Sequence, residues 1–511
     1  MIQETHKESS SLTARAAWMM FAKTLAFAFS FALPVLLVRR LDQKEFGLYK
    51  QVFLFVGTAF SLLPLGVGMS AFYFLPREPE RRHQVVFNIL LFHLLISIVA
   101  CLTLLARPTL LASLFNGAEM AAYAPLVGLV VFTWVASSSL EMIAVANNEM
   151  KLATLFVITS QFTKSFFLLA AAIFFGTVES LLYAALIQGV LQTALLLFYL
   201  NARFKGFWRG FQWEMLKVQL AYALPLGFAS MLYRAQTELD NYFVSHKFGA
   251  GVYAIYAVGC FELPLLGVLS DAVSSVTIPR ISYLQKHGER REIAELIARM
   301  MRKLSALLLP LYFFLLIAGR EFLTTLFTAQ YLPSWPIFVI NLTLIPLTLI
   351  TSAYDPVIRA FAEHRYFLLK LRGVLLVVFV TGLWLVLGRY GLIGAITVMV
   401  TVNVIDRLVI ARKVKNILGV TRRDLFLLKD VGKIALASIT GAAVAFIARS
   451  FVIGMKPLLM LIVCGIAFSI AYLLAVLLLG IVSQEERGAI TRQLARVGRL
   501  TSLRRAADPL A

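Results

Sequence analysis

Residues 222–258 read YALPLGFASMLYRAQTELDNYFVSHKFGAGVYAIYAV. The apolar parts of this stretch suit a membrane helix, which needs about 20 mostly apolar residues to cross the hydrocarbon core. Yet Arg234, Glu238 and Asp240 lie close together near its middle. An ionisable side chain at the centre of a membrane helix costs about 2.5–3.5 kcal/mol on insertion scales. The stretch therefore predicts a membrane helix with a polar face that meets protein or water.

The composition places the whole chain in the same class. Hydrophobic residues make up 60% of its 511 residues, against about 45–50% in a soluble domain. Apolar runs recur from end to end, and they lack the alternation of a β-barrel. We predict an all-α polytopic membrane protein with about 14 transmembrane helices. The predicted spans are 16–38, 47–74, 85–106, 122–145, 152–174, 178–200, 221–244, 252–278, 304–319, 336–360, 373–387, 391–411, 434–451 and 457–482.

Basic residues predict the orientation of these spans. Most of the 48 Lys and Arg residues fall in loops on the same side as the N-terminus. The positive-inside rule then places both termini in the cytoplasm of a bacterial inner membrane. The net charge of +21 follows from this bias and from attraction to anionic lipid, so no nucleic-acid partner is predicted. Apolar stripes in the basic segments 293–301 and 490–500 predict interfacial helices.

The chain divides at a basic linker after the sixth span. The segments EFGLYKQVFLF and KFGAGVYAIYAV open the two parts alike, which indicates a weak internal repeat. The predicted domains are a cytoplasmic N-terminus 1–15, an N-lobe 16–200, a linker 201–220, a C-lobe 221–411, two further helices in 434–482 and a basic amphipathic cytoplasmic tail 483–511. The segments 434–448 and 457–481 contain no ionisable residue and predict peripheral helices that face lipid.

Several segments resemble one family. They are RRLDQKEFGLYKQ (39–51), the stretch 222–258, SSVTIPRISYL (274–284) and YGLIGAITVMVTVNVI (390–405). These segments are similar to the Wzx-type polysaccharide flippases of the multidrug/oligosaccharidyl-lipid/polysaccharide (MOP) superfamily. The resemblance implies two six-helix lobes in a V plus two peripheral C-terminal helices. It also implies that the substrate is a polyprenyl-pyrophosphate-linked oligosaccharide, which moves from the cytoplasmic to the external leaflet for surface polysaccharide biosynthesis.

Depth along the spans selects three candidate cations. Arg234 lies about 20 Å into its span and past the midplane, at 1.5 Å per residue. Lys164 is similarly deep in the fifth span, and Lys23 lies in the cytoplasmic half of the first. We predict that these three line a central cavity and attract the pyrophosphate, since a guanidinium can bind two phosphate oxygens.

The charged span also offers a structural alternative. Arg234, Glu238 and Asn241 share one helix face, whereas Asp240 points elsewhere. An Arg234–Glu238 ion pair that only stabilises the bundle would explain the same spacing. Glu141, Arg359, Asp406 and Arg407 lie near span ends, where anchoring at the membrane interface explains them.

Other polar residues are candidates for secondary roles. The residues predicted to bind a coupling proton or Na⁺, or to pair with the cations, are Glu238, Asp240, Glu262, Asp271 and Asp355. The residues predicted to contact sugar hydroxyls are Gln161, Gln188, Gln192, Asn241 and Asn403. Hydrogen bonds between helices are an equal alternative for these amides. No Walker A loop and no histidine spacing for a metal occurs, so no cofactor beyond a coupling ion is predicted.

Rival functions remain open at this stage. A multidrug or cation antiporter and a lipid II flippase belong to the same superfamily. A glycan polymerase or ligase is disfavoured because the predicted external loops are short and no catalytic constellation is present, so the chain is not predicted to be an enzyme. A scaffold would not explain the repeat or the charges. The expected partners are a lipid-linked oligosaccharide, membrane lipids, and a polysaccharide polymerase with its export machinery.

Overall fold

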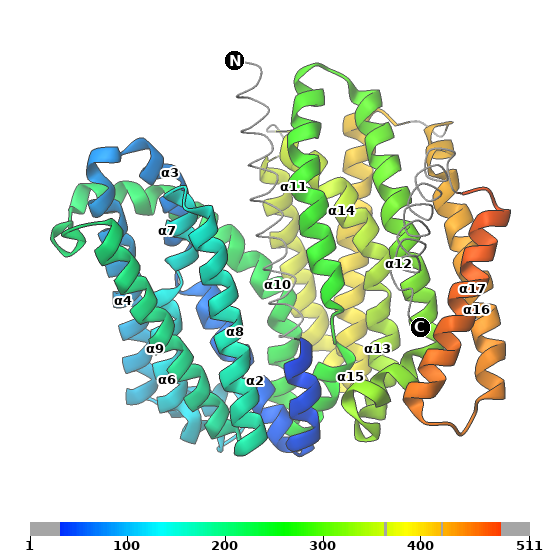
Figure 1. Cartoon of the computed structure of the whole chain (residues 1–511), viewed down its shortest axis with the longest axis horizontal. Helices are drawn as coiled ribbons and strands as arrows, with labels where there is room; N and C mark the ends of the chain where they lie inside the picture. The colour runs from blue at the N-terminus through cyan, green and yellow to red at the C-terminus, as the bar shows by residue number, and fades with distance from the viewer. Residues whose placement is uncertain (1–30, 362–364, 421–422, 482–511) are drawn as a thin grey trace, which may run out of the picture. The chain divides into compact units, whose positions relative to one another are not determined.

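The computed structural model describes residues 31–361, 365–420 and 423–481. The regular elements in these ranges are all helices and none is a strand, which confirms the predicted class (Figure 1). With η for a 3-10 helix, the order is α2 (Gln43–Leu62), η1 (Val67–Met69), α3 (Ser70–Arg77), η2 (Pro79–Arg81), α4 (Arg82–Ala106), α5 (Thr109–Phe115), α6 (Met120–Ser137), α7 (Leu140–Ala146), α8 (Met150–Phe174), α9 (Val178–Arg203), η3 (Phe207–Arg209), α10 (Trp213–Gly259), α11 (Pro264–Lys286), α12 (Arg290–Phe327), η4 (Ala329–Ser334), α13 (Trp335–Leu342), α14 (Leu344–Ala360), α15 (Arg365–Leu418), η6 (Arg423–Leu428), α16 (Lys429–Phe451) and α17 (Pro457–Leu478).

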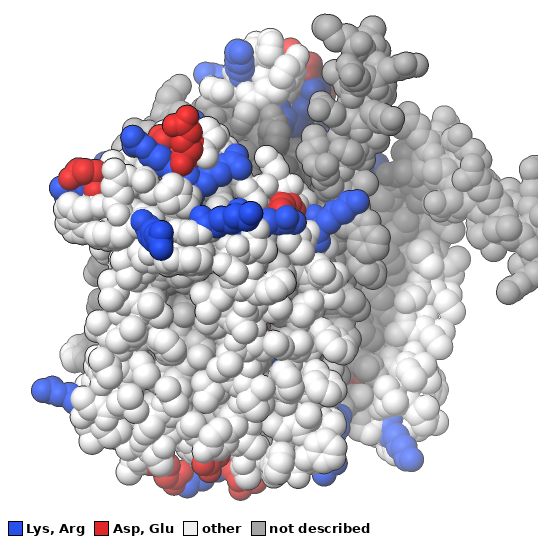
Figure 2. All heavy atoms as spheres, turned by 60° about the vertical axis from the view of Figure 1, so that its left-hand side comes forward, with Lys and Arg blue, Asp and Glu red and all other residues white. Residues whose placement is uncertain are grey.

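Length and hydropathy confirm a polytopic membrane protein. Within the described residues, 10 helical segments are long and apolar enough to cross a membrane, and a bent pair makes up to 11. Charged side chains gather along two opposite edges of the face that Figure 2 shows, and the surface between them carries few charges. Most of the first predicted span, 16–38, and the tail 483–511 lie outside the described residues. The count of 14 and the orientation of the termini stay predictions.

The chain forms two compact units. The first comprises Met1–Asp271, Leu326–Asn341 and Glu363–Asp406, and the second comprises Ala272–Thr325, Leu342–Ala362 and Arg407–Ala511. Both α11 and α15 contribute residues to each unit. The predicted lobe boundaries and the V-shaped arrangement stay predictions.

Close contact between α2 and α10 organises the first unit. A side chain on Gly47 of α2 would overlap the backbone of Ala250, and one on Gly227 of α10 would overlap the backbone of Leu65. Glycine is therefore required at both positions, because no larger residue lets two backbones approach this closely. Between these points the buried Gln51 amide donates to the hydroxyl of Ser245 at 2.7 Å.

The second predicted span, 47–74, is not one helix. α2 ends at Leu62, and the segment from Val67 onward leaves at a bend of 43°. Pro64 lacks the N–H that a continuing helix requires. Gly66 has φ +73, which suits glycine, and the α10 backbone leaves no room for a side chain there.

The eighth predicted span, 252–278, is also interrupted. α10 kinks at Gly249, where φ is 73 and ψ is 177, and its last part ends at Gly259. Residues 260–263 are not helical, and Pro264 begins α11, where its missing N–H costs nothing. The prediction of one continuous helix is wrong here, so Glu262 lies in a break and not inside a helix.

A long amphipathic helix organises the second unit. α12 runs without interruption over 38 residues, from Arg290 to Phe327. The apolar stripe 293–301 belongs to this helix, and Ile293, Ile297 and Met301 are all buried. The prediction that this stripe lies on the membrane surface as an interfacial helix is therefore wrong, because protein contacts already cover it.

The hairpin of α16 and α17 packs on α12. Phe468 of α17 meets the ring of Phe314 at 5.6 Å, and the Tyr472 hydroxyl donates to the carbonyl of Ala306 at 3.0 Å. Arg449 at the end of α16 binds the buried Glu321 carboxylate of α12 at 2.7 and 2.9 Å. The outer surface of α17 is apolar and exposed, as a lipid-facing helix requires. Arg449 follows directly after the uncharged segment 434–448, so α16 carries its charge at the end of the helix and not along the apolar part.

Replacing Gly227 with alanine tests the α2–α10 contact. The new methyl group would overlap the Leu65 carbonyl, and such overpacking costs about 1–3 kcal/mol. We expect a lower Tm for purified Gly227→Ala in thermal unfolding. The matched control is Gly432→Ala in α16, where nothing lies within 4 Å of the new methyl group. An equal loss of stability in both variants would contradict the contact.

Candidate functional site

A hydrogen-bonded cluster of charged and polar residues lies on one face of α10. The Arg234 guanidinium pairs with the Glu238 carboxylate at 3.1 Å. Asn241 donates to the other oxygen of Glu238 at 3.3 Å. The Tyr253 hydroxyl donates to the amide oxygen of Asn241, also at 3.3 Å. The three residues that the sequence assigned to one face are thus joined, and a tyrosine beyond the Gly249 kink holds them.

The ion pair is only partly covered by protein. The Arg234 side chain is 37% exposed and that of Glu238 is 22% exposed. Arg234 lies against Gly57 of α2, where a methyl group would come within 3.8 Å of Nη2. The cation therefore occupies space that the small residue on the opposite helix leaves open, and part of it remains accessible.

Two further charges belong to this cluster. Lys50 of α2 and Glu262 of the break before α11 lie within electrostatic range of the Glu238 carboxylate. Glu262 also lies within electrostatic range of Arg234. The cluster thus contains two cations and two anions drawn from α2, α10 and the break. We name Lys50, Arg234, Glu238 and Glu262 the charged cluster.

Sequence reasoning missed Lys50. It falls inside the predicted span 47–74, four positions after Phe46, and its amine lies 5.6 Å from the centroid of that ring. The available signal was a lysine within an apolar run, which is the same signal that selected Lys164.

Asp240 occupies a different face of α10. It is 1% exposed, and it accepts a hydrogen bond from the Tyr256 hydroxyl at 2.7 Å. Its second oxygen has no hydrogen-bond partner among the described residues. The sequence separated Asp240 from Arg234, and the structure shows the same separation.

Lys164 lies in an aromatic environment. Its amine is 4.3 Å from the centroid of the Trp134 ring, within the range of a cation–π contact. Trp134 donates to the carbonyl of Ala185 at 3.0 Å, and Phe60 of α2 packs against it. The indole is thus fixed in place as a platform for the amine. Lys23, the third predicted cation, lies outside the described residues.

Most predicted sugar contacts are engaged within the bundle. Gln188, which is buried, donates to Gln192 at 2.7 Å, and Ser160 of α8 donates to the same oxygen at 3.1 Å. Asn403 donates to the Met399 carbonyl of its own helix at 3.0 Å. These contacts fit the alternative of hydrogen bonds within and between helices. Asn241 alone of the predicted amides joins the cluster on α10, and Gln161 is half-buried on α8.

The structure describes the side chain of only one of the two remaining predicted carboxylates. Asp355 is buried and belongs to the second unit. The side chain of Asp271 is outside the described part of the structure. No group of three or more metal-ligating side chains occurs among the described residues.

A family profile covers the charged cluster. The profile described as "Polysaccharide biosynthesis protein" matches residues 36–336, more than half of the chain. The chain belongs to this family. All four residues of the charged cluster and Lys164 lie within the matched range. Comparison with curated proteins gives no match.

Solved structures show which fold this member of the polysaccharide biosynthesis family has. The lipid II flippase MurJ, in an inward closed conformation, matches with a TM-score of 0.70 at 15% identity, over 89% of this chain and 97% of that chain. An inward-facing multidrug resistance MATE family transporter of the MOP superfamily matches with a TM-score of 0.56 at 18% identity, over 76% and 95%. A MOP superfamily transporter from Pyrococcus furiosus matches with a TM-score of 0.55 at 17% identity, over 80% and 95%.

Family and fold together confirm the predicted class. The chain belongs to the polysaccharide biosynthesis family, and it has the fold of the solved MurJ and MATE transporters. The substrate and the roles of individual residues are a separate question.

Cysteine labelling tests whether the charged cluster meets water. In a variant without the native Cys101, Cys260 and Cys464, we expect Asn241→Cys to react with a charged, water-soluble thiol reagent. A charged reagent and a thiolate both require water, because charges are costly in hydrocarbon.

The control is Leu385→Cys on α15. Leu385 is 62% exposed, but it is apolar and is expected to face lipid. It should react much more slowly than position 241. Equal rates at the two positions, or no reaction at position 241, would show that the cluster does not line a water-filled space.

Proposed function

We propose that this chain moves a polyprenyl-pyrophosphate-linked oligosaccharide across the cytoplasmic membrane by alternating access. The observation that carries the proposal is the charged cluster, which lies inside the range matched by a polysaccharide biosynthesis family. A pyrophosphate cannot cross hydrocarbon unaided, and cations within the membrane offset the cost of its charge. A polymerase that extends the exported glycan would be the expected partner.

The ion pair gives the cluster a mechanism for binding an anion. At rest, Glu238 neutralises Arg234, so the site without ligand does not hold an uncompensated charge. When a pyrophosphate arrives, the guanidinium exchanges the carboxylate for phosphate oxygens, which its planar fork can bind two at a time. Asn241 and Tyr253 then remain to hold Glu238 in place. Binding therefore breaks the ion pair of Glu238 with Arg234 and places the guanidinium on the phosphate.

Lys50 supplies a second cation near this carboxylate. It lies on α2, whereas Arg234 lies on α10, so a pyrophosphate that binds both would bridge two helices. Rocking motions in transporters with internal repeats move such helices relative to each other around a fixed site. The substrate's charge would thus favour one arrangement of α2 and α10 over the other.

Replacing Arg234 with glutamine tests the cation role. The assay uses purified protein in liposomes with a fluorescent polyprenyl-pyrophosphate oligosaccharide. We expect a loss of flipping rate of about tenfold or more, because a hydrogen bond to a charged group contributes about 1.5–3 kcal/mol. The matched control is Arg291→Gln, which removes an exposed i,i+4 arginine from its pair with Glu295. That variant should flip substrate normally.

A charge swap separates the cation role from a purely structural pair. Arg234→Glu combined with Glu238→Arg keeps an i,i+4 ion pair but moves the cation by one turn. Full activity of the swapped protein would sink the cation proposal. Loss of activity in a folded swapped protein supports it.

The same liposome assay with other substrates tests the rival transport functions. The best TM-score quoted above, 0.70, belongs to a lipid II flippase, and this favours lipid II as the second candidate substrate. Faster flipping of lipid II than of the oligosaccharide would assign that substrate. Transport of a cationic dye with neither lipid moved would assign a multidrug antiporter.

We also propose Asp240 as the site of a coupling proton or Na⁺. It is buried, and no basic side chain pairs with it among the described residues. Tyr256 donates to one oxygen and leaves the other without a partner. A buried carboxylate of this kind is suited to binding a small cation.

An imposed ion gradient tests this coupling role. We expect Asp240→Asn to lose the stimulation of flipping by a proton or Na⁺ gradient and to retain flipping without a gradient. Glu292→Gln, an exposed carboxylate at the start of α12, serves as the control. A gradient response equal to that of the unchanged protein would remove Asp240 from the coupling step.

A further inference from the structure

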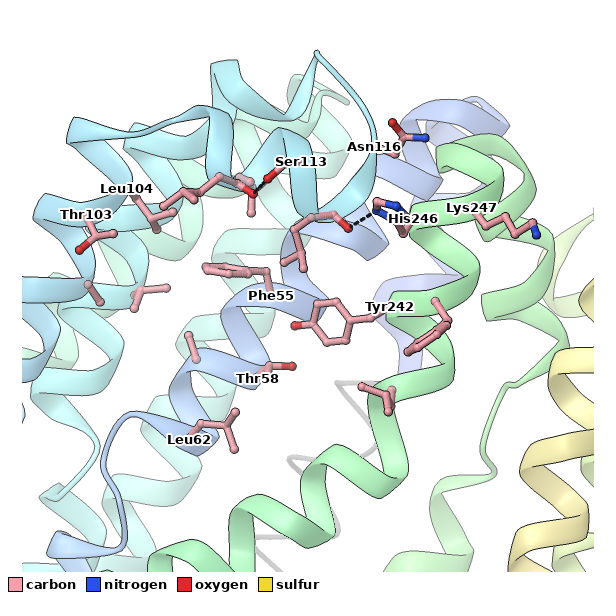
Figure 3. Close-up of a pocket in the computed structure, with 18 of the residues that line it drawn as sticks. Phe55, Thr58, Leu62, Thr103, Leu104, Ser113, Asn116, Tyr242, His246 and Lys247 are labelled. Carbon is pink, nitrogen blue, oxygen red and sulfur yellow. Dashed lines mark hydrogen bonds between the residues drawn. The ribbon is translucent and has the colours of Figure 1, made fainter. Parts of the chain in front are cut away.

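A large apolar pocket lies in the first unit beside the charged cluster: Tyr242 lines it and lies within electrostatic range of Glu238 and Arg234. Its volume is about 1330 Å³, and none of the four cluster residues lines it. The lining comes from α2, α4, α5, α6, α10 and α15, with Phe55, Leu104, Leu111 and Leu383 among its apolar side chains. Figure 3 shows Phe55, Thr58 and Leu62 of α2 facing Tyr242 of α10 across this space. A space of this size and lining suits a hydrocarbon chain.

One end of the pocket is polar. Ser113, Asn116, His246 and Lys247 gather there, at the ends of α5 and of the first part of α10 (Figure 3). The His246 ring contacts the Leu114 carbonyl at 3.1 Å, which fixes the ring at this rim. The pocket is therefore amphipathic along its length, with an apolar body and a polar mouth.

Lys247 supplies the cation at this end of the pocket. No carboxylate pairs with it within residues 31–361, 365–420 and 423–481. Its amine lies beside Gly388 of α15, where a methyl group on the glycine would come within 3.1 Å of Nζ. Lys247 lines this end of the pocket, and Figure 3 shows its side chain directed outward, away from Phe55 and Tyr242, so the amine lies at the outer edge of the mouth.

The side of the pocket is open to an apolar surface. Trp384 in its lining is 74% exposed, and Leu110 is 43% exposed. On a membrane-spanning unit, such residues are expected to face lipid chains. A molecule that enters from this side must itself be a membrane component.

We propose that this pocket is a specific site for an anionic phospholipid. One acyl chain occupies the apolar body, and the phosphodiester lies beside Lys247 and His246. A single cation complements the single negative charge of a phosphodiester, whereas a pyrophosphate carries more charge. The proposal goes beyond the proposed transport function, and it does not depend on the identity of the transported substrate.

Native mass spectrometry of the full-length protein tests the site. The probes are phosphatidylglycerol and phosphatidylcholine with identical acyl chains. We expect phosphatidylglycerol to bind roughly fivefold more tightly, because one lysine at the headgroup level favours an anionic lipid by about that factor. Lys247→Gln should bind the two lipids equally. Lys456→Gln, which removes an exposed lysine between α16 and α17, should keep the preference.

A second pair of variants tests the apolar body without altering charge. Ala100 of α4 lines the pocket, so Ala100→Trp should fill it and remove the tightly bound phosphatidylglycerol. Val99, the preceding residue, does not line the pocket and is 58% exposed, so Val99→Trp should leave binding unchanged. Equal effects of the two tryptophans would overturn the assignment of the pocket.

Competition distinguishes the phospholipid from other ligands. Inorganic phosphate alone should not displace phosphatidylglycerol, since it lacks the chain; displacement would reduce the site to a phosphate site and overturn the proposal. Polyprenyl phosphate that displaces phosphatidylglycerol at equal concentration would overturn it as well. Equal binding of the two phospholipids to the unchanged protein would do the same.

Discussion

The close approach of α2 and α10 is the constraint on which the first unit depends. Gly47 and Gly227 remove the side chains that would keep the two backbones apart, and the Gln51–Ser245 hydrogen bond lies between these contacts. In a membrane, helices gain little from burying apolar side chains, since lipid is equally apolar. Close backbone packing and hydrogen bonds therefore carry the association. The same approach brings Lys50 toward the face of α10 that carries Arg234.

The charged cluster is stable because it balances its own charge. Two cations and one further anion lie within electrostatic range of Glu238. Asn241 donates to its carboxylate, and Tyr253 donates to Asn241. A lone charge at this position would cost several kcal/mol. A balanced cluster lowers that cost and still allows a ligand to replace one of its members. The balance of charge thus serves both the stability of the cluster and its proposed exchange of a carboxylate for a ligand.

The spacing of residues in the sequence predicted the features that depend on the geometry of a single helix. Spacing alone placed Arg234, Glu238 and Asn241 on one face, since a helix fixes that relation. It could not place Lys50, whose position depends on how α2 packs against a helix nearly two hundred residues away. The break at Pro64–Gly66 has a local signal in its proline, and the α10 backbone against Gly66 adds a constraint that the sequence does not show. The stripe 293–301 was read as membrane-facing because an apolar face looks the same whether lipid or protein covers it.

The contact between Gly57 and Arg234 has an evolutionary consequence. The guanidinium stands where a side chain from position 57 would extend, and even an alanine methyl group there would just touch it. A residue larger than alanine at position 57 would displace the end of the Arg234 side chain, which couples the two positions. In relatives that carry another residue in place of Arg234, position 57 is free to enlarge. The pair should therefore covary, and a bulky residue at position 57 would indicate a transporter that has lost this cation.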